Sequence, residues 1–147
     1  MSTAAQADNF STARRVAALL VREYCEAMNT GDAEKLLSLL DDDVVHDVNQ
    51  GERREGKERF KAFQARMAHH YKETLADPVV MVARNGERAA VEYNIEGVYL
   101  DTEQGLPAAK KQAYTLPGGT FFAIKDGKIS RISSYFNMTD WITQIAD

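Results

Sequence analysis

The fold is decided in residues 79–99, which read VVMVARNGERAAVEYNIEGVY. Apolar and polar residues alternate before and after Asn85-Gly86, a dipeptide that favours the tight turn of a β-hairpin. The pattern returns downstream around Asp126-Gly127. The four predicted strands cover residues 79–84, 88–99, 113–124 and 128–137. The second half of the chain is therefore predicted to form consecutive antiparallel strands.

Helical spacing dominates the chain before these strands. Apolar residues recur every fourth position from Val16 to Met28, and Gly31-Asp32 ends this helix and caps the next. The predicted elements are a first helix capped by Ser11 or Thr12, a second around Leu36–Leu40, a strand at Val44–Asn49, a third helix at Lys57–His70 and a terminal helical turn at Thr139–Ala146. Helices followed by a run of strands indicate an α+β fold, with helices packed inside a curved sheet.

The chain has 147 residues, the size of one domain, and we expect a single domain over 11–147 after a flexible segment 1–10. Its net charge of −4 argues against a nucleic-acid partner. No stretch approaches the about 20 apolar residues of a membrane span, so no membrane partner is expected. A single cysteine, Cys25, suits a reducing cytoplasm.

Particular stretches add a family resemblance that covers residues 12–145. They are YCEAMNTGD (24–32), LLDDDVVHD (39–47), REG (54–56), FFAI (121–124), DGKI (126–129) and YFN (135–137). These stretches resemble the nuclear transport factor 2-like superfamily, and within it the SnoaL-like and ketosteroid-isomerase-related branch. The resemblance implies a cone-shaped α+β barrel, with three N-terminal helices packed in a strongly curved, mixed and mostly antiparallel sheet. It also implies cofactor-free chemistry in the cone, although this fold hosts many activities.

Ketosteroid isomerases combine a tyrosine and a protonated aspartic acid as an oxyanion hole with an aspartate base. The resemblance places Tyr24 at the tyrosine and Thr120 at the aspartic acid. The base position falls on Val48 without a gap, or on Asp47 if the strand carries a bulge. We therefore expect a poor ketosteroid isomerase.

Epoxide-hydrolase-like members of this superfamily use a tyrosine and an asparagine on the first strand and an Asp–Arg–Asp set on later strands. His46 and Val48 occupy the first two positions here, Glu96 or Asn94 lies near the next two, and Ser134 replaces the last aspartate. The set is incomplete, so the resemblance does not choose one reaction.

Alternation in the strand at 88–99 puts Glu92, Asn94 and Glu96 on one face. The resemblance turns this polar face toward the cone, where the two glutamates would raise each other's pKa. The apolar face, with Val91, Tyr93 and Ile95, would then point outward and, with Tyr135, form a homodimer interface on the convex side. The reverse orientation, with the carboxylates in solvent, is equally open.

We therefore expect an acid–base enzyme for a small apolar or carbonyl-containing ligand, without cofactor or metal; the alternative is a non-catalytic binding or dimerisation module. Tyr24 would donate a hydrogen bond, and His46 or Asp47 would act as base, unless His46 is structural. The candidate catalytic residues are Tyr24, His46, Asp47, Glu92 and Glu96. The candidate ligand-binding residues are Val48, Phe63, Asn94, Thr120, Phe122, Ser134, Phe136 and Trp141.

Overall fold

The computed structural model describes residues 3–146. The elements in chain order are α1 (Thr3–Thr30), α2 (Ala33–Ser38), β1 (Leu40–Val48), β2 (Arg54–Glu55), α3 (Lys57–His70), β3 (Tyr71–Val82), β4 (Arg88–Tyr99), β5 (Ala113–Lys125), β6 (Lys128–Phe136) and α4 (Met138–Ile145). The predicted order, helices with an early strand and then a run of strands, is confirmed.

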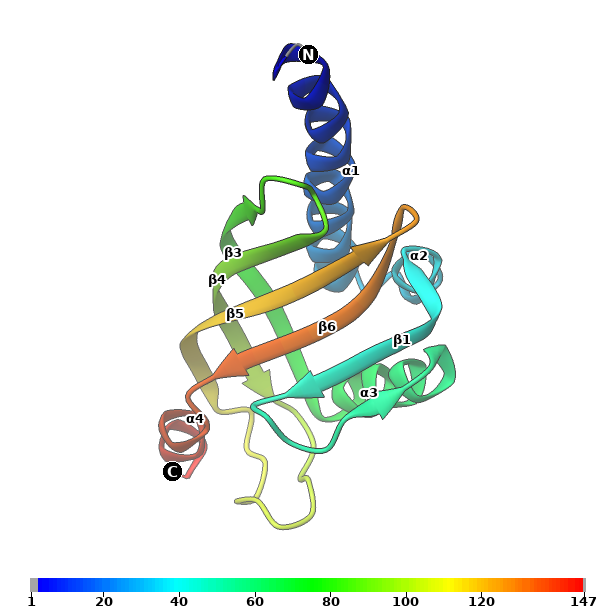
Figure 1. Ribbon diagram of the computed structural model, residues 1–147. Coiled ribbons are helices and arrows are strands. Elements are labelled where there is room, and N and C mark those ends of the chain that lie inside the picture. Colours follow the sequence, from blue (N-terminus) through cyan, green and yellow to red (C-terminus); the bar gives the residue numbers. More distant parts are fainter. Residues whose placement is uncertain (1–2, 147) are drawn as a thin grey trace.

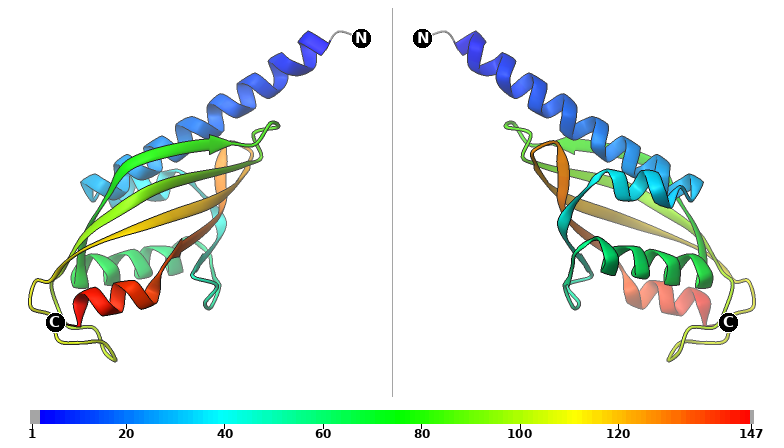
Figure 2. Two further views of the ribbon diagram at one scale, coloured as in Figure 1. Left: turned by 90° about the vertical axis from the view of Figure 1, so that its left-hand side faces the viewer. Right: turned by 90° about the vertical axis from the view of Figure 1, so that its right-hand side faces the viewer.

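One curved sheet of six strands carries the fold, in the order β2-β1-β6-β5-β4-β3. Only β1 and β6 run parallel, and the other neighbours are antiparallel. Figure 1 shows α1 and α3 behind the sheet, and the side views in Figure 2 show the strands bending around these helices. The predicted cone-like α+β fold with a mixed, mostly antiparallel sheet is confirmed, although β2 and β3 leave the sheet unclosed.

The first helix begins at Thr3, well before the predicted caps Ser11 and Thr12. Tertiary contacts with the β3–β4 hairpin accompany this extension. The Arg14 guanidinium donates to the backbone oxygen of Arg84 at 2.9 Å, and the Arg84 guanidinium lies over the Phe10 ring. Figure 2 shows α1 continuing past this hairpin. The expected flexible segment is thus helical from Thr3 on, and residues 1 and 2 lie outside the described part.

Strand β3 begins at Tyr71, directly after α3, whereas the sequence predicted a strand only from Val79. The pairing with β4 is interrupted between Ala76 and Val79, where Asp77 has a φ of 53° before Pro78. A bulge accommodates a proline, which has no N–H for the ladder. Because the bulge interrupts the two-residue alternation, periodicity alone does not show that residues 71–82 form one strand.

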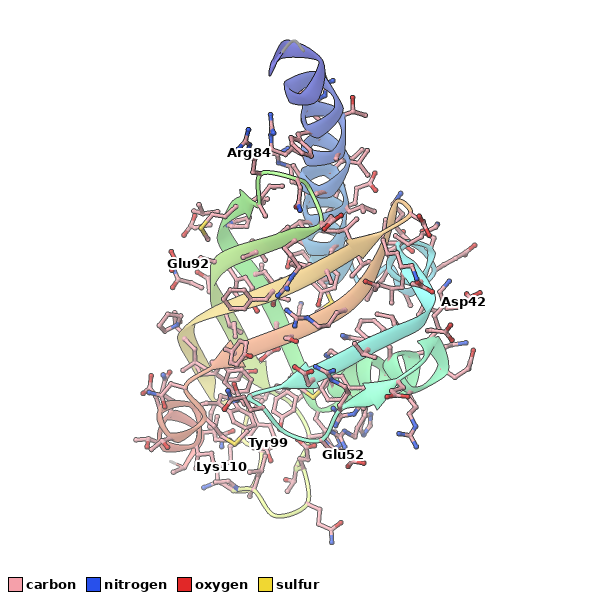
Figure 3. The ribbon with its side chains drawn as sticks, viewed as in Figure 1. Asp42, Glu52, Arg84, Glu92, Tyr99 and Lys110 are labelled. Carbon is pink, nitrogen blue, oxygen red and sulfur yellow. The ribbon has the colours of Figure 1, made fainter. Side chains whose placement is uncertain are left out.

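The orientation of β4 corrects the expectation drawn from the family resemblance. Val91, Tyr93 and Ile95 are buried against the helices, so they cannot form a convex dimer interface. Glu92, Asn94 and Glu96 are exposed on the other face, and Figure 3 shows Glu92 pointing away from the body. The helices present an apolar surface to the inner face of the sheet, and the apolar side chains of β4 pack against it. Tyr135 does lie exposed on the convex face.

Within residues 3–146, none of the helices is both long and apolar enough for a membrane span.

Candidate functional site

A pocket of about 270 Å³ opens between the end of α1, α2 and one face of α3. We call it the helix pocket. Its lining residues are Ala27, Met28, Gly31, Ala33, Leu36, Leu37, Phe60, Lys61, Gln64, Ala65, Met67, Ala68, Tyr71 and Glu73. Most of these side chains are apolar, and a few polar groups interrupt them. This composition is typical of sites for small organic ligands.

Glu73 supplies the one carboxylate of the helix pocket, and the sequence reading did not single it out. Tyr71, Glu73 and Leu75 alternate along β3, and pairing with Tyr99, Gly97 and Ile95 of β4 turns them toward the helices. The Tyr114 hydroxyl donates a hydrogen bond to Oε2 of Glu73.

The environment of Glu73 favours its protonated form. Burial raises the pKa of its carboxyl above the usual value, and the Tyr114 hydrogen bond lowers it only in part. The residue as a whole is nevertheless exposed to solvent. A carboxyl group with a raised pKa that remains accessible suits proton transfer near neutral pH.

A second phenol–carboxylate pair lies beside the first. Tyr71 lines the helix pocket, and its hydroxyl donates to Oε2 of Glu103 in the loop after β4. Nε of Arg66 approaches Oε1 of Glu103 at 3.6 Å. Burial, followed by the hydrogen bond to Glu103, raises the pKa of Tyr71, so its hydroxyl stays protonated at neutral pH.

The predicted donors Tyr24 and Thr120 lie deeper in the cone. Thr120 Oγ1 is 2.8 Å from the hydroxyl of Tyr93 and 2.9 Å from Oγ of Ser134. Tyr24 packs its ring edge against Phe122 at 5.1 Å, and burial raises its pKa. Tyr24 thus contacts Phe122, and Thr120 and the half-buried Ser134 form a separate hydrogen-bonded group with Tyr93.

His46 faces the interior, as expected of a residue in the cone, but it is enclosed by aromatic rings. Phe60 and Phe63 contact its ring edge-on, at centroid distances of 5.0 and 4.8 Å. Burial and the nearby Arg54 charge lower its pKa to about 4. Its Nδ1 has no hydrogen-bond partner among the described residues. His46 is therefore neutral at pH 7.

Asp47 lies on the opposite face of β1 from His46, because the register shift of this strand falls between Leu40 and Val45, before both residues. The pairing with β6 runs without interruption from Val45 to Val48. Arg53 donates to Oδ2 of Asp47 through Nε at 3.0 Å and Nη2 at 2.8 Å. These bonds, with one to Ser133, lower the pKa of Asp47 despite its burial. Asp47 is thus a paired carboxylate on the convex side.

The remaining predicted residues divide by strand face. Val48 pairs with Ser134 on the inner face, and Phe136 packs 6.0 Å from Trp141, which is buried at the α4 end. Glu92, Asn94 and Glu96 lie on the outer face and cannot join Tyr24. The alternation of Tyr71 and Glu73 could have indicated that both side chains face the helix pocket, but nothing in the sequence indicated that β3 starts at Tyr71.

Among the side chains of residues 10–146, no three potential metal-binding groups of His, Cys, Asp or Glu come together. His69 and His70 both approach Asp101 instead, at 2.9 and 3.6 Å. The helix pocket contains one carboxylate, one lysine and one glutamine as its polar side chains besides Tyr71. These groups suit hydrogen bonding to an organic molecule.

Comparison with known proteins gives a consistent relationship. A family model described as SnoaL-like domain matches residues 21–132. A candidate polyketide cyclase from Pseudomonas putida KT2440 is 50% identical, with 88% of this chain and 98% of that chain covered and a TM-score of 0.87. A candidate polyketide cyclase from Xanthomonas campestris pv. campestris is 45% identical, with 90% and 98% covered and a TM-score of 0.88.

A more distant solved structure shares the fold alone. An LEH-like epoxide hydrolase of Mycobacterium tuberculosis is 16% identical, with 90% of this chain and 86% of that chain covered and a TM-score of 0.72. No curated protein matches the chain.

Proposed function

Because this chain belongs to the SnoaL-like domain family, we propose that it binds a small, largely apolar, carbonyl-containing molecule in the helix pocket and performs cofactor-free acid–base chemistry on it. The observation that carries the proposal is Glu73, an accessible carboxyl group with a raised pKa at a mostly apolar pocket. The two bacterial relatives are candidate polyketide cyclases, which makes ring closure our first choice of reaction. Isomerisation, dehydration and hydrolysis are further choices.

In this mechanism Glu73 accepts a proton from the carbon next to the ligand carbonyl and returns a proton later in the reaction. The Tyr114 hydrogen bond holds the carboxylate in place. Gln64 and Lys61 line the same pocket and carry N–H donors for the carbonyl oxygen, where negative charge develops. A positioned acid–base group of this kind contributes about 10²–10⁴-fold to a rate.

Tyr24, Thr120 and Ser134 are proposed as the inner wall of the cone. The hydroxyls of Thr120 and Ser134 are committed to the chain's own cluster with Tyr93, and the Tyr24 ring packs against Phe122. This closed cluster favours the second candidate function, a binding module without chemistry. The two candidates differ in one measurable property, the exchange of a proton on the bound ligand.

The test combines binding with proton exchange. A panel of small ketones would be screened by thermal shift, and the deuterium uptake of each stabilising ketone at its α-carbon would be followed by NMR in D2O. We expect Glu73→Gln to keep the thermal shift and to lose about 10²-fold or more of the exchange rate. Ala65→Trp, which fills the helix pocket, would remove both signals, whereas Ala83→Trp on the distant β3–β4 hairpin would change neither.

Three results would count against the proposal. Exchange that Glu73→Gln leaves unchanged would exclude Glu73 as the base. Binding without exchange in the wild-type protein would favour the binding module. Binding that survives Ala65→Trp would place the ligand outside the helix pocket.

A homodimer through the convex sheet face remains a proposal, with a changed residue set. Exposed apolar side chains there include Phe121 and Tyr135, whose rings lie 5.6 Å apart. Val79 and Met81 of β3 are also exposed. A second copy would cover these groups. Sedimentation equilibrium would test it, and a monomer at micromolar concentration would contradict it.

A cytoplasmic location is likewise proposed, from the single free Cys25.

A further inference from the structure

A second pocket lies on a different face of α3 from the helix pocket, and its composition is opposite. It measures about 340 Å³ and is lined by Glu52, Arg54, Arg59, Ala62, Phe63 and Arg66. We call it the arginine pocket. Three guanidinium groups against one carboxylate leave it a formal charge of +2, in a chain whose net charge is −4. In Figure 3, Glu52 lies on the loop between β1 and β2, at the outer edge of the molecule.

Two of these guanidinium groups lie over the Phe63 ring. The Cζ atom of Arg54 lies 4.4 Å from the ring centroid, and that of Arg66 lies 5.4 Å from it. Stacking on an aromatic face restricts a guanidinium while its N–H edge stays free to donate. Two arginine forks are therefore partly pre-organised beside one ring, which reduces the entropy lost when they bind an anion.

The acidic residues nearby leave much of this positive charge uncompensated. Asp47 is bound by Arg53, and Glu103 approaches Arg66 at 3.6 Å. Neither Arg54 nor Arg59 forms an ion pair with any side chain between residues 10 and 146. Glu52 is the acidic side chain of the pocket lining itself.

We propose that the arginine pocket binds the dianionic phosphate group of a small phosphate monoester, with the apolar part of the ester against Phe63. A phosphate monoester carries about −1.5 to −2 charges at pH 7, so the arginines of the pocket attract it more strongly than they attract one carboxylate. Arginine forks bind phosphate oxygens through paired N–H donors. The site is separate from the helix pocket and does not depend on the proposed function.

The binding test uses phenyl phosphate, inorganic phosphate and benzoate in calorimetric titrations of the full chain at low salt. We expect phenyl phosphate to bind more tightly than benzoate. Arg59→Gln would weaken phenyl phosphate about tenfold or more, because a hydrogen bond to a charged group is lost. Arg54→Lys would also weaken it, because lysine keeps the charge but loses the stacked fork.

Two further variants make the result specific. Glu52→Gln removes the competing carboxylate and should tighten phenyl phosphate binding severalfold, a gain that a misfolded variant could not produce. Arg15→Gln removes an exposed guanidinium from α1 and should leave the affinity unchanged. No binding up to about 10 mM, binding insensitive to Arg59→Gln, or benzoate binding as tight as phenyl phosphate would each overturn the proposal.

Discussion

The Tyr114 hydroxyl reaches across strand β4 to the Glu73 carboxylate, although the two residues lie on β5 and β3 and are 41 positions apart in sequence. Gly97 is the residue between them, because it pairs with Glu73 on one side and Tyr114 on the other. A Cβ atom at Gly97 would lie 2.2 Å from Cζ of Tyr114. The missing side chain of Gly97 therefore allows the hydrogen bond of the proposed acid–base group.

Gly97→Ala is expected to displace the Tyr114 ring and to break its bond to Glu73. Overpacking of this kind destabilises a protein by about 1–3 kcal/mol, which chemical denaturation would measure. Gly119→Ala is the control, since a Cβ there meets Val91 O at an ordinary 3.4 Å. Equal stabilities for the two variants would contradict this account of Gly97.

Tyr114→Phe is expected to raise the pKa of Glu73 further. The Tyr114 hydrogen bond lowers this pKa, whereas burial raises it, so removing the hydroxyl leaves burial unopposed. A carbon-13 NMR titration of the Glu73 carboxyl would measure the change. Tyr135→Phe, at an exposed tyrosine on the convex face, is the control. A Glu73 pKa that falls in Tyr114→Phe would show that the bond does not favour the carboxylate.

Glu73 also links stability to pH. A carboxyl whose pKa is raised on folding binds its proton more strongly in the folded state, so the free energy of unfolding decreases as pH rises through the interval above the ordinary value of about 4.5. Glu73→Gln should remove this decrease. Its stability relative to the wild-type protein would then increase with pH across the interval, as measured by urea denaturation. A constant difference would argue against a raised pKa.

Activity as a ketosteroid isomerase should be poor. Thr120 stands where the resemblance requires an acidic donor, and its hydroxyl lies within hydrogen-bonding distance of Tyr93 and Ser134. Losing one oxyanion donor reduces a rate by about 10²–10³-fold. Absorbance of the conjugated product would follow the conversion of a Δ5-3-ketosteroid. A rate close to that of a true isomerase would show that another group replaces the missing acid.

The fold could be predicted well because turn residues and hydrophobic spacing, which are local features, determine most of its elements. Asp126-Gly127 forms the expected tight turn between β5 and β6, with a positive φ at both residues. Asn85-Gly86 also lies between paired strands, but in a longer connection from Val82 to Arg88. Helical spacing located the segments now seen as α1 and α3. These signals act within a few residues, so they need no knowledge of the tertiary structure. Element starts were less predictable, because contacts with other elements accompany the early start of α1 and a bulge interrupts β3.

The site was predicted only in part, for a physical reason. Alternation shows that Glu92 and Glu96 share a face, but the packing of α1 decides which face is inside. Glu73 meets Tyr114 only through the register of three strands, which no local pattern reports. The sequence left open whether His46 or Asp47 faces the interior, and the enclosure of His46 by two phenylalanine rings depends on the position of α3.

His46 should make the protein sensitive to mild acid. Burial and the Arg54 charge lower its pKa from an ordinary 6.5 to about 4. The unfolded chain therefore takes up a proton at this histidine between these values while the folded chain does not, so stability falls as pH falls from 6.5 toward 4. The difference corresponds to roughly 3 kcal/mol over the whole interval.

His46→Leu removes the titrating ring and the unpartnered Nδ1, so its free energy of unfolding should change less between pH 7 and pH 4.5 than that of the wild-type protein. The slope is the informative quantity, because it is independent of any packing change at pH 7. Met81→Leu, at an exposed residue without a titratable group, should keep the wild-type slope. Urea denaturation at a series of pH values would measure all three proteins. If His46→Leu kept the wild-type slope, other groups would account for the acid sensitivity, and His46 would titrate near its ordinary pKa.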